Sequence, residues 1–320
     1  MSRSNFTFLA TILAAILLSG FLAAPSEAEI TPAYLYSLAN FHGKLPYSSV
    51  RVRVDRVHDE TYVVDQGIVR VFNEFGMEIY WFGDDTELRG IFDLAVDEKG
   101  DLFLLTLDQT IPDAPKYQLV KCNYRGVVQE KHEVSGLPSG FDRFFPSYLL
   151  YREGEFYFLS STQMKLVVTD RNGVFLRGYD LGKIADVPEK DRPNTEIFGF
   201  NLDSEGNLLF TIPTQFQAYV VSPEGKMKAS FGKRGSAPGG FGIISGIARD
   251  DRGNYLVVER LRSVVMIFDK EFRFVKEFGY RGEMPGNLAR PNEVAVGNNG
   301  KIFVTQLRSL GVSVFSITQN

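Results

Sequence analysis

The feature of this sequence that most constrains its fold is a turn that recurs at a nearly constant interval. In five places a polar stretch ends in glycine and is followed at once by β-forming residues. The glycines are Gly100, Gly154, Gly206, Gly253 and Gly300, at intervals of 54, 52, 47 and 47 residues. A sixth copy, without glycine, lies around Asp59 and Glu60. This periodicity predicts a chain of repeated supersecondary units.

A second polar turn follows each first one. These turns end at Gly76, Gly126, Gly173, Gly225 and Phe272. The runs between the turns are rich in Val, Ile, Phe, Tyr and Leu, which is typical of strands joined by tight turns. Each repeat therefore holds four short antiparallel strands, the composition of a propeller blade. The six first turns predict an all-β, six-bladed β-propeller.

Residues 231–279 form the clearest copy, with Phe-Gly-x-Arg-Gly, a Pro-bearing loop, Ile-Ala-Arg-Asp, Gly-Asn-Tyr-Leu-Val and Val-Met-Ile-Phe-Asp in order. This copy resembles the NHL repeat, and the resemblance covers the last two complete repeats, about 90 residues. It implies a six-bladed propeller of the kind found in exported bacterial NHL-repeat proteins. The family places Asp six residues after the first glycine. This sequence instead has Thr106, Ser160, Ile212, Glu259 and Gln306, so a role for a ring of Asp is not carried over.

The last repeat has only three strands before the chain ends at Asn320. The segment Leu35–Pro46 resembles the missing fourth strand, since Gly43 aligns with Gly282 and Pro46 with Pro285. We expect this segment to complete the last blade, because the edge would otherwise expose its backbone hydrogen-bonding groups.

The turn Phe-Gly-x-Arg-Gly is written twice, 47 residues apart. In the structural interpretation, the phenylalanine of each copy packs between blades and the final glycine adopts a backbone angle that other residues avoid. In the functional interpretation, the two arginines clamp a ligand. The residues are Phe231, Arg234 and Gly235 in the first copy and Phe278, Arg281 and Gly282 in the second.

Residues 1–28 have the pattern of a cleavable signal peptide. Arg3 precedes an apolar run of about 16 residues, and the small residues Ser26 and Ala28 follow at the −3 and −1 positions of a cleavage site. The alternative, a membrane anchor, needs about 20 apolar residues. We therefore expect residues 29–320 to form a single propeller that is periplasmic or extracellular.

The net charge of −4 disfavours a nucleic-acid partner. No stretch after the leader is long and apolar enough to cross a bilayer, and we expect a monomer. The single cysteine, Cys122, lies in the apolar context LVKCNY and is expected to be a buried, unreactive thiol.

The repeat order assigns each loop to one face of the ring. The connections between second and third strands share a face with the inter-blade connections, and loops on one face of a rigid scaffold are common binding sites. Three long loops fall there, at 106–118, 137–147 and 182–196. The candidate binding residues on this face are Phe141, Phe144, Phe145, Arg234, Phe241 and Arg281. A neutral variation of exposed loop lengths is the alternative.

The residues seven places before each first glycine should surround the channel mouth. They are Asp93, Ser147, Gly199, Gly246 and Glu293, and blade one is ambiguous between Val52 and Arg53. Oxygen ligands from Asp93, Asn292 and Glu293 could hold Ca²⁺, an arrangement similar to lactonase-type propellers. The alternative is a polar, hydrated channel.

The three histidines, His42, His58 and His132, fall on different faces and on the rim, which argues against a zinc site. The sequence contains no Gly-x-Ser-x-Gly elbow, P-loop or dinucleotide fingerprint. It therefore favours an exported, non-enzymatic scaffold that binds a protein, peptide or glycan and needs no cofactor. The alternative is a Ca²⁺-dependent hydrolase with its site at the channel mouth.

Overall fold

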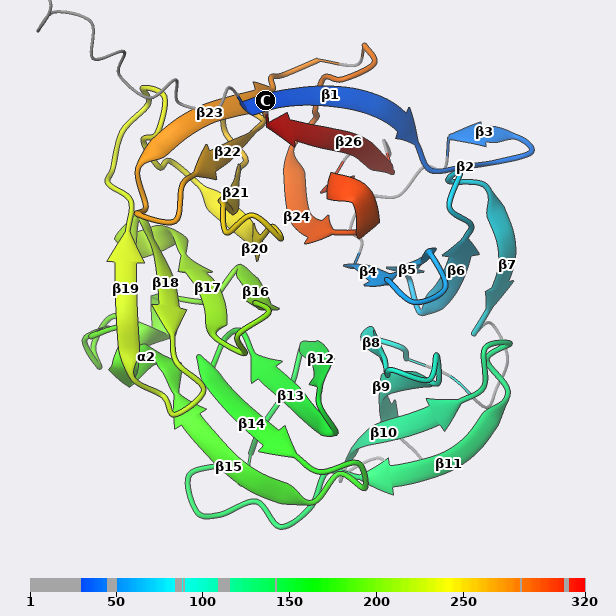
Figure 1. Ribbon diagram of the computed structural model, residues 1–320. Coiled ribbons are helices and arrows are strands. Elements are labelled where there is room, and N and C mark those ends of the chain that lie inside the picture. Colours follow the sequence, from blue (N-terminus) through cyan, green and yellow to red (C-terminus); the bar gives the residue numbers. More distant parts are fainter. Residues whose placement is uncertain are drawn as a thin grey trace, which may run out of the picture. The chain divides into compact units, whose positions relative to one another are not determined.

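Six four-stranded antiparallel sheets stand around a common axis (Figure 1). The computed structural model describes residues 30–44, 51–83, 88, 90–108, 116–141, 143–282, 284–307 and 311–319. Within them, Pro32–Ile317 form one compact unit, to which the following description applies. The predicted all-β, six-bladed β-propeller is confirmed. The expected signal peptide lies outside the described residues.

Within each blade the strands follow the chain from the innermost to the outermost. The last blade is the exception, because its outermost strand comes from the N-terminal segment. Blades one and two are β4 (Arg51–Asp55), β5 (Glu60–Asp65), β6 (Ile68–Phe72), β7 (Glu78–Phe82), and β8 (Asp93–Val96), β9 (Leu102–Asp108), β10 (Lys116–Cys122), β11 (Val128–Glu133). Blades three and four are β12 (Tyr148–Arg152), β13 (Glu155–Ser160), β14 (Lys165–Thr169), β15 (Phe175–Asp180), and β16 (Gly199–Leu202), β17 (Leu208–Ile212), β18 (Gln217–Val221), β19 (Met227–Phe231). Blades five and six are β20 (Ile244–Arg249), β21 (Tyr255–Glu259), β22 (Val264–Phe268), β23 (Phe274–Gly279), and β24 (Pro291–Val296), β25 (Lys301–Gln306), β26 (Val312–Gln319), β1 (Ile30–Ser37).

The N-terminal segment closes the ring as predicted, but with other bounds: the closing strand is β1, Ile30–Ser37, which shares only residues 35–37 with the predicted Leu35–Pro46. Strand β1 lies against β26, and the sheet order is β1-β26-β25-β24. The N–H of Leu38 donates to the carbonyl of Val312 at 2.9 Å, and the ring of Tyr34 packs edge-on against Phe315 at 5.7 Å. A short hairpin of β2 (Ala39–Asn40) and β3 (Gly43–Lys44) follows β1. Pro46, which was aligned with Pro285, lies outside the described residues.

Most of the recurring turns are held by a side chain at their first position. In the turn after β8, the Asp97 carboxylate accepts the N–H groups of Lys99 and Asp101 at 2.9 and 3.0 Å. The residue at the glycine position adopts a left-handed conformation, and where glycine is absent Asp59 and Phe272 adopt it instead, with φ of 55° and 63°. The sequence pattern of polar residues before glycine is therefore a local hydrogen-bonding requirement.

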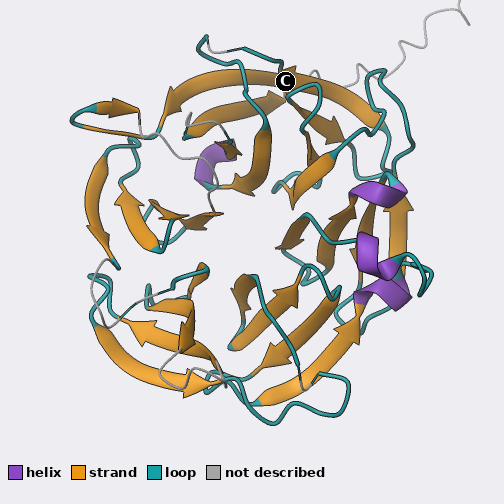
Figure 2. Ribbon diagram, turned by 180° about the vertical axis from the view of Figure 1, so that it is seen from behind, coloured by secondary structure: helices purple, strands orange, loops and turns teal. Residues whose placement is uncertain are grey.

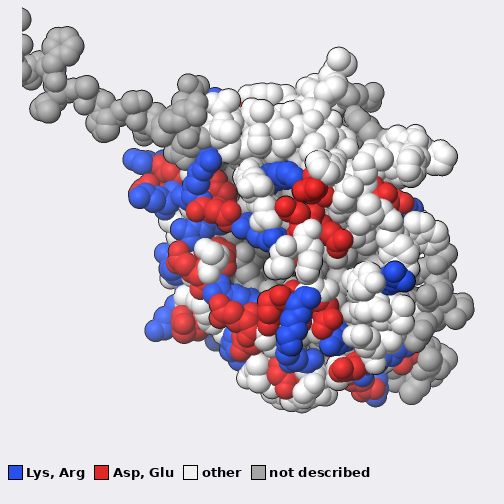
Figure 3. Space-filling model, turned by 45° about the vertical axis from the view of Figure 1, so that its right-hand side comes forward, with Lys and Arg blue, Asp and Glu red and all other residues white. Residues whose placement is uncertain are grey.

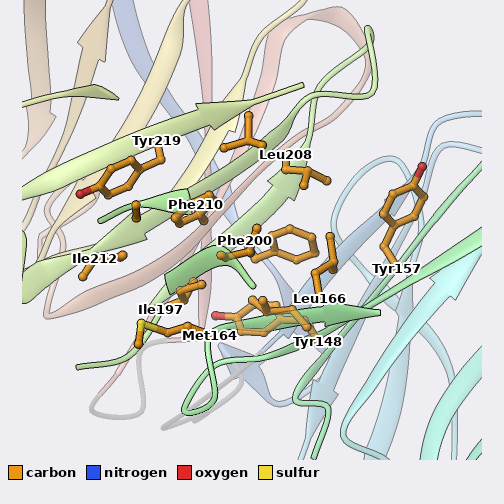
Figure 4. Packing of buried hydrophobic residues seen from close by; sticks show 14 of the residues in the cluster. Tyr148, Tyr157, Met164, Leu166, Ile197, Phe200, Leu208, Phe210, Ile212 and Tyr219 are labelled. Carbon is orange, nitrogen blue, oxygen red and sulfur yellow. The ribbon is translucent and has the colours of Figure 1, made fainter. Parts of the chain in front are cut away.

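The core lies between neighbouring blades. Figure 4 shows one cluster, in which Tyr148, Leu166, Phe200 and Phe210 of blades three and four interdigitate. Cys122 is buried in another of these clusters, as expected.

The phenylalanines of the duplicated turn pack as predicted, but its glycines differ from the prediction. Phe231 and Phe278 are buried, as expected; Phe231 stacks on Phe272 of the next blade at 5.1 Å. The left-handed backbone falls at Gly232 and Gly279, each with φ of 110°, and not at the predicted Gly235 and Gly282. The physical reason is the close approach of the next loop: a Cβ on Gly232 would lie 2.2 Å from the Phe241 ring, and one on Gly279 2.5 Å from Leu288.

Helical structure is limited to short connections, seen in purple in Figure 2. They are α2 (Leu181–Ile184), η1 (Arg192–Asn194), η2 (Pro213–Gln215) and η3 (Asn298–Gly300). Across the described part of the chain, no helix has the length and apolar character that a bilayer span requires.

Candidate functional site

The central channel opens at two mouths, which the repeat order predicted to lie on different faces. The upper mouth, at the starts of the innermost strands, is a cavity of about 410 Å³. The lower mouth, at the ends of those strands, is a cavity of about 450 Å³. The upper mouth is lined by Arg51, Val64, Gln66, Gly67, Ile91, Phe92, Tyr148, Ser161, Glu196, Ile197, Phe198, Arg260 and Asn292. The lower mouth includes Arg56, Tyr151, Arg152, Asp203, Ser204, Arg249 and Asp251.

The residues predicted to surround the channel do lie on its innermost strands. Two of them are glycines because the neighbouring blade leaves no space for a side chain. A Cβ on Gly199 would lie 2.2 Å from the carbonyl oxygen of Ser245, and one on Gly246 would lie 2.7 Å from Cα of Glu293. In blade one, Val52 is buried, whereas the arginines on either side of it reach the channel carboxylates.

Four charged side chains, Arg51, Arg53, Asp93 and Glu293, form what we call the channel network. Arg51 pairs with Glu293, and Arg53 pairs with Asp93 at 2.5 Å. Two longer contacts cross between these pairs, from Arg51 to Asp93 at 3.9 Å and from Arg53 to Glu293 at 3.7 Å. Asp93 also accepts the backbone N–H of Leu149 at 2.9 Å. The network thus connects blades one, two, three and six across the axis.

Burial dominates the electrostatics of the network. It raises the pKa of Asp93, and the charges of Arg53 and Arg51 oppose this shift. Burial acts to lower the pKa of Arg51, but the charges of Glu293, Tyr148 and Asp93 outweigh it and the pKa is raised. The guanidinium of Arg51 lies over the Tyr148 ring at 3.5 Å. The Tyr148 hydroxyl donates to the carbonyl of Phe198 at 2.6 Å, and burial raises its pKa to about 12.

The expected calcium ligands are only partly brought together. Asp93 and Glu293 belong to the channel network, and Asn292 lines the upper mouth. A cation held by these carboxylates would have to replace their arginine partners. Within the described ranges, no three His, Cys, Asp or Glu side chains are grouped as metal ligands. Calcium binding by Asp93, Asn292 and Glu293 stays a prediction.

Arg260 is the upper-mouth residue that sequence reasoning missed. It follows β21, and its guanidinium lies 5.5 Å above the Phe198 ring. Burial lowers its pKa, and so does the positive charge of Arg290. Among the residues that the structure describes, Arg260 makes no ion pair, whereas Arg51 beside it does. Arg260 is therefore a cation held in a partly desolvated position without a protein anion.

The residue before Arg260 fixes the turn that carries it. The Glu259 carboxylate accepts the N–H groups of Ile243 and Arg262, both at 2.8 Å. In blade six, Gln306 occupies the same place and accepts the N–H of Ala289 at 2.8 Å. The row that replaces the Asp of the NHL pattern therefore links each turn to an inter-blade loop in these two blades. Arg260 directly follows Glu259 in the sequence, and this place next to a residue of the row was the signal that could have revealed it.

At the lower mouth the arginines have partners. Arg249 pairs with Asp203 at 3.0 Å, and Arg56 pairs with Asp251 at 2.7 Å. Arg152 donates to the carbonyl of Asp203 at 3.0 Å. Figure 3 shows acidic and basic side chains mixed around the central hollow of the face in view. This pattern stabilises contacts between blades.

The aromatic residues expected on the binding face differ in exposure. Phe144 and Phe241 are buried, which corrects the expectation that a partner could reach them: each fills a gap beneath its own loop. Phe141 is half-buried against Phe144 and Phe175. Phe145 is 52% exposed.

The predicted arginine clamp lies in two separate loops. Both arginines are exposed. The backbone of Arg234 forms an isolated β-bridge with Phe241, and that of Arg281 forms one with Leu288. A joint role in ligand binding stays a prediction.

The long loops contribute unequally to the upper mouth. The loop at 182–196 begins with α2, whose N-cap Asp180 accepts the N–H of Lys183 at 2.8 Å, and it ends at Glu196 on the cavity rim. Residues 109–115 of the loop at 106–118 lie outside the described residues. The histidines remain apart: His58 bonds to Asp55 and His132 to Glu130, while His42 lies in the β2–β3 turn.

Comparisons with known proteins place the fold and leave the family open. No protein-family model and no curated protein matches the chain. A protein of unknown function from Bacteroides thetaiotaomicron matches with a TM-score of 0.62 and 9% identity, over 91% of this chain and 77% of the other. A gluconolactonase from Xanthomonas campestris matches with a TM-score of 0.57 and 14% identity, over 92% and 93%. An inactive virginiamycin B lyase from Staphylococcus aureus, with quinupristin, matches with a TM-score of 0.56 and 9% identity, over 91% and 100%. At these identities the similarity shows the propeller fold alone.

Proposed function

We propose that this protein is an exported, non-enzymatic binding module of the NHL-like propeller type, and that it takes a group of a protein, peptide or glycan partner into the upper mouth. The observation that carries the proposal is the cavity of about 410 Å³, in which aromatic walls surround an arginine without a carboxylate partner. A concave site with apolar walls and a few polar groups is the usual form of a ligand site. Export rests on the pattern of residues 1–28.

The surrounding architecture supports a preformed site. The cavity walls come from all six blades, and the channel network holds four of them together. A rigid site loses little conformational entropy when it binds, and this favours affinity. The carboxylates of the channel network, Asp93 and Glu293, pair with Arg51 and Arg53 and are engaged in holding the ring together.

A blocking substitution tests the proposal. Glu196 is exposed on the rim of the upper mouth, so Glu196→Trp should fill the cavity without disturbing the core. Ser204→Trp is the matched control, because Ser204 is exposed at the lower mouth. We expect a partner that is captured from the native host extract and identified by mass spectrometry to bind wild type and Ser204→Trp, and to be lost from Glu196→Trp. Equal capture by all three proteins would refute the proposal.

A calcium-dependent hydrolase with Asp93, Asn292 and Glu293 as ligands is the alternative. Calcium titration followed by thermal melting separates the two. The binding-module proposal expects no calcium-dependent rise in Tm. A rise of several degrees that is lost in Asn292→Ala would favour the hydrolase, since Asn292 is half-buried and lies outside the channel network.

A further inference from the structure

We infer that the upper mouth binds the terminal carboxylate of a peptide whose last residue is apolar, with Arg260 as the residue that receives the carboxylate. This inference rests on the proposed function and names the chemistry of its ligand. Three features of the upper mouth carry it: its charge balance, the fixed position of Arg260, and the apolar wall beside that arginine.

The charge balance fits a single negative charge. The channel network contains two arginines and two carboxylates, so its net charge is zero. Above it, Arg260 makes no ion pair among the described residues, and Arg290 lies close enough to repel its charge. Glu196 is exposed at the rim and makes no ion pair with Arg260 among the described residues. A single guanidinium without an ion pair suits a carboxylate, with its one negative charge, better than a dianionic phosphate.

The guanidinium of Arg260 is held in place for such a contact. It lies on the ring of Phe198, whose carbonyl is in turn fixed by the Tyr148 hydroxyl. Glu259 ties the adjoining turn, through Arg262, to the inter-blade loop, through Ile243. A planar guanidinium held in this way can donate two parallel hydrogen bonds to a carboxylate, the strongest neutralising contact that arginine makes.

Part of the lining of the upper mouth is an apolar wall. Phe198 lies under Arg260 and follows Ile197, whereas Ile91 and Phe92 come from the start of blade two. Ile91 and Ile197 are buried, and Phe92 is 41% exposed. An apolar side chain placed there would cover Phe92 and remove apolar surface from water. The amide of Asn292 can pair with the peptide backbone.

The same apolar wall favours a peptide over an acidic glycan as the ligand. A sugar ring needs several hydrogen-bonding partners, but the Ser161 hydroxyl is already bonded to Ser147 at 2.8 Å. A carboxylate beside an apolar group, as at a peptide C-terminus, uses one cation and one apolar wall. The upper mouth supplies these two features.

The test uses an array of short peptides, each made once with a free C-terminal carboxylate and once as the amide, together with hexuronate oligosaccharides as the glycan probe. We expect free-acid peptides ending in Leu, Ile, Val or Phe to bind the purified protein, and their amides to bind roughly 10- to 100-fold more weakly, as for loss of a charged hydrogen bond. In Arg260→Gln the affinity for the free acid should fall by the same factor. Calorimetric titration of the best peptide measures both changes.

Arg125→Gln is the matched control variant. Arg125 also lies over an aromatic ring, at 5.4 Å from Tyr124, but it is exposed in a turn on the other face. Unchanged affinity in Arg125→Gln and an unchanged Tm in Arg260→Gln would show that the loss is local. Equal binding of acids and amides, or full binding by Arg260→Gln, would overturn the carboxylate inference while leaving a ligand site at the mouth. Binding of the hexuronates without the peptides would overturn the peptide assignment. Binding of the acids by Glu196→Trp would overturn the upper mouth itself as the site.

Discussion

The two mouths of the channel are alike in size but differ in the ion pairing of their arginines. At the lower mouth, Arg249 and Arg56 have carboxylate partners on other blades. At the upper mouth, Arg51 belongs to the channel network, whereas Arg260 makes no ion pair among the described residues. Pairing between blades stabilises the ring, but a partly desolvated cation without an anion does not. The comparison indicates that the lower mouth is built for stability and the upper mouth for a ligand.

The largest expected effect comes from breaking the channel network. Asp93→Ala removes a fully buried carboxylate that pairs with Arg53 and accepts the N–H of Leu149. We expect a loss of about 3–5 kcal/mol in the free energy of unfolding, because the half-buried Arg53 keeps only its longer contact to Glu293 and the N–H of Leu149 loses its acceptor. Urea unfolding measures the change. A loss below about 1 kcal/mol would mean that paired charges do not hold this ring together.

A smaller loss is expected when a paired arginine of the lower mouth is removed. Arg249→Gln deprives the buried Asp203 of its cation, but Asp203 keeps the hydrogen bonds from Glu205 and Asn207. We expect a cost of about 1–3 kcal/mol, the range for hydrogen bonds to charged groups. Urea unfolding of the variant and of wild type provides the measurement. An unchanged free energy of unfolding would contradict the claim that the lower mouth is built for stability.

The same pairing should be visible in a titration. Hydrogen bonds from Arg249, Asn207 and Lys228 lower the pKa of Glu205 to about 2. Because the folded-state pKa is lowered, this contribution to stability is present above pH 4.5 and is lost as the pH falls toward 2. In Arg249→Gln the pKa should move back toward 4.5. NMR titration of the Glu205 carboxylate checks both values, and an identical pKa in the two proteins would contradict the pairing.

The smallest effect on stability is expected at Arg260. Because Arg260 makes no ion pair among the described residues, Arg260→Gln should change the free energy of unfolding by less than about 0.5 kcal/mol, the range for substitutions that break no strong interaction. The comparison with Arg249→Gln is direct, since both changes remove one arginine from a channel mouth. Destabilisation equal to that of Arg249→Gln would show that Arg260 has a structural partner.

Much of this architecture could be predicted because it repeats along the chain. The turn glycines marked the blades, and the likeness of Leu35–Pro46 to an outer strand predicted how the ring closes. The order of strands then assigned every loop to a face. These inferences need only local hydrogen-bonding patterns and the knowledge that sheet edges must be covered.

The chemistry of the channel could not be predicted in the same way. Arg51 and Glu293 are separated by 242 residues, and nothing local shows that they pair. Asp93 and Glu293 therefore looked like free oxygen ligands. Arg260 resembled any charged residue in a turn, because the absence of a partner is a property of three-dimensional packing. Burial of Phe144 and Phe241 likewise depends on how each loop folds back on its blade.

A crystal structure of the protein with the tightest free-acid peptide tests the central claim most directly. Our account predicts that the terminal carboxylate lies within hydrogen-bonding distance of the Arg260 guanidinium and that the last side chain covers Phe92. A peptide bound at the lower mouth, or one whose carboxylate points away from Arg260 into solvent, would contradict it.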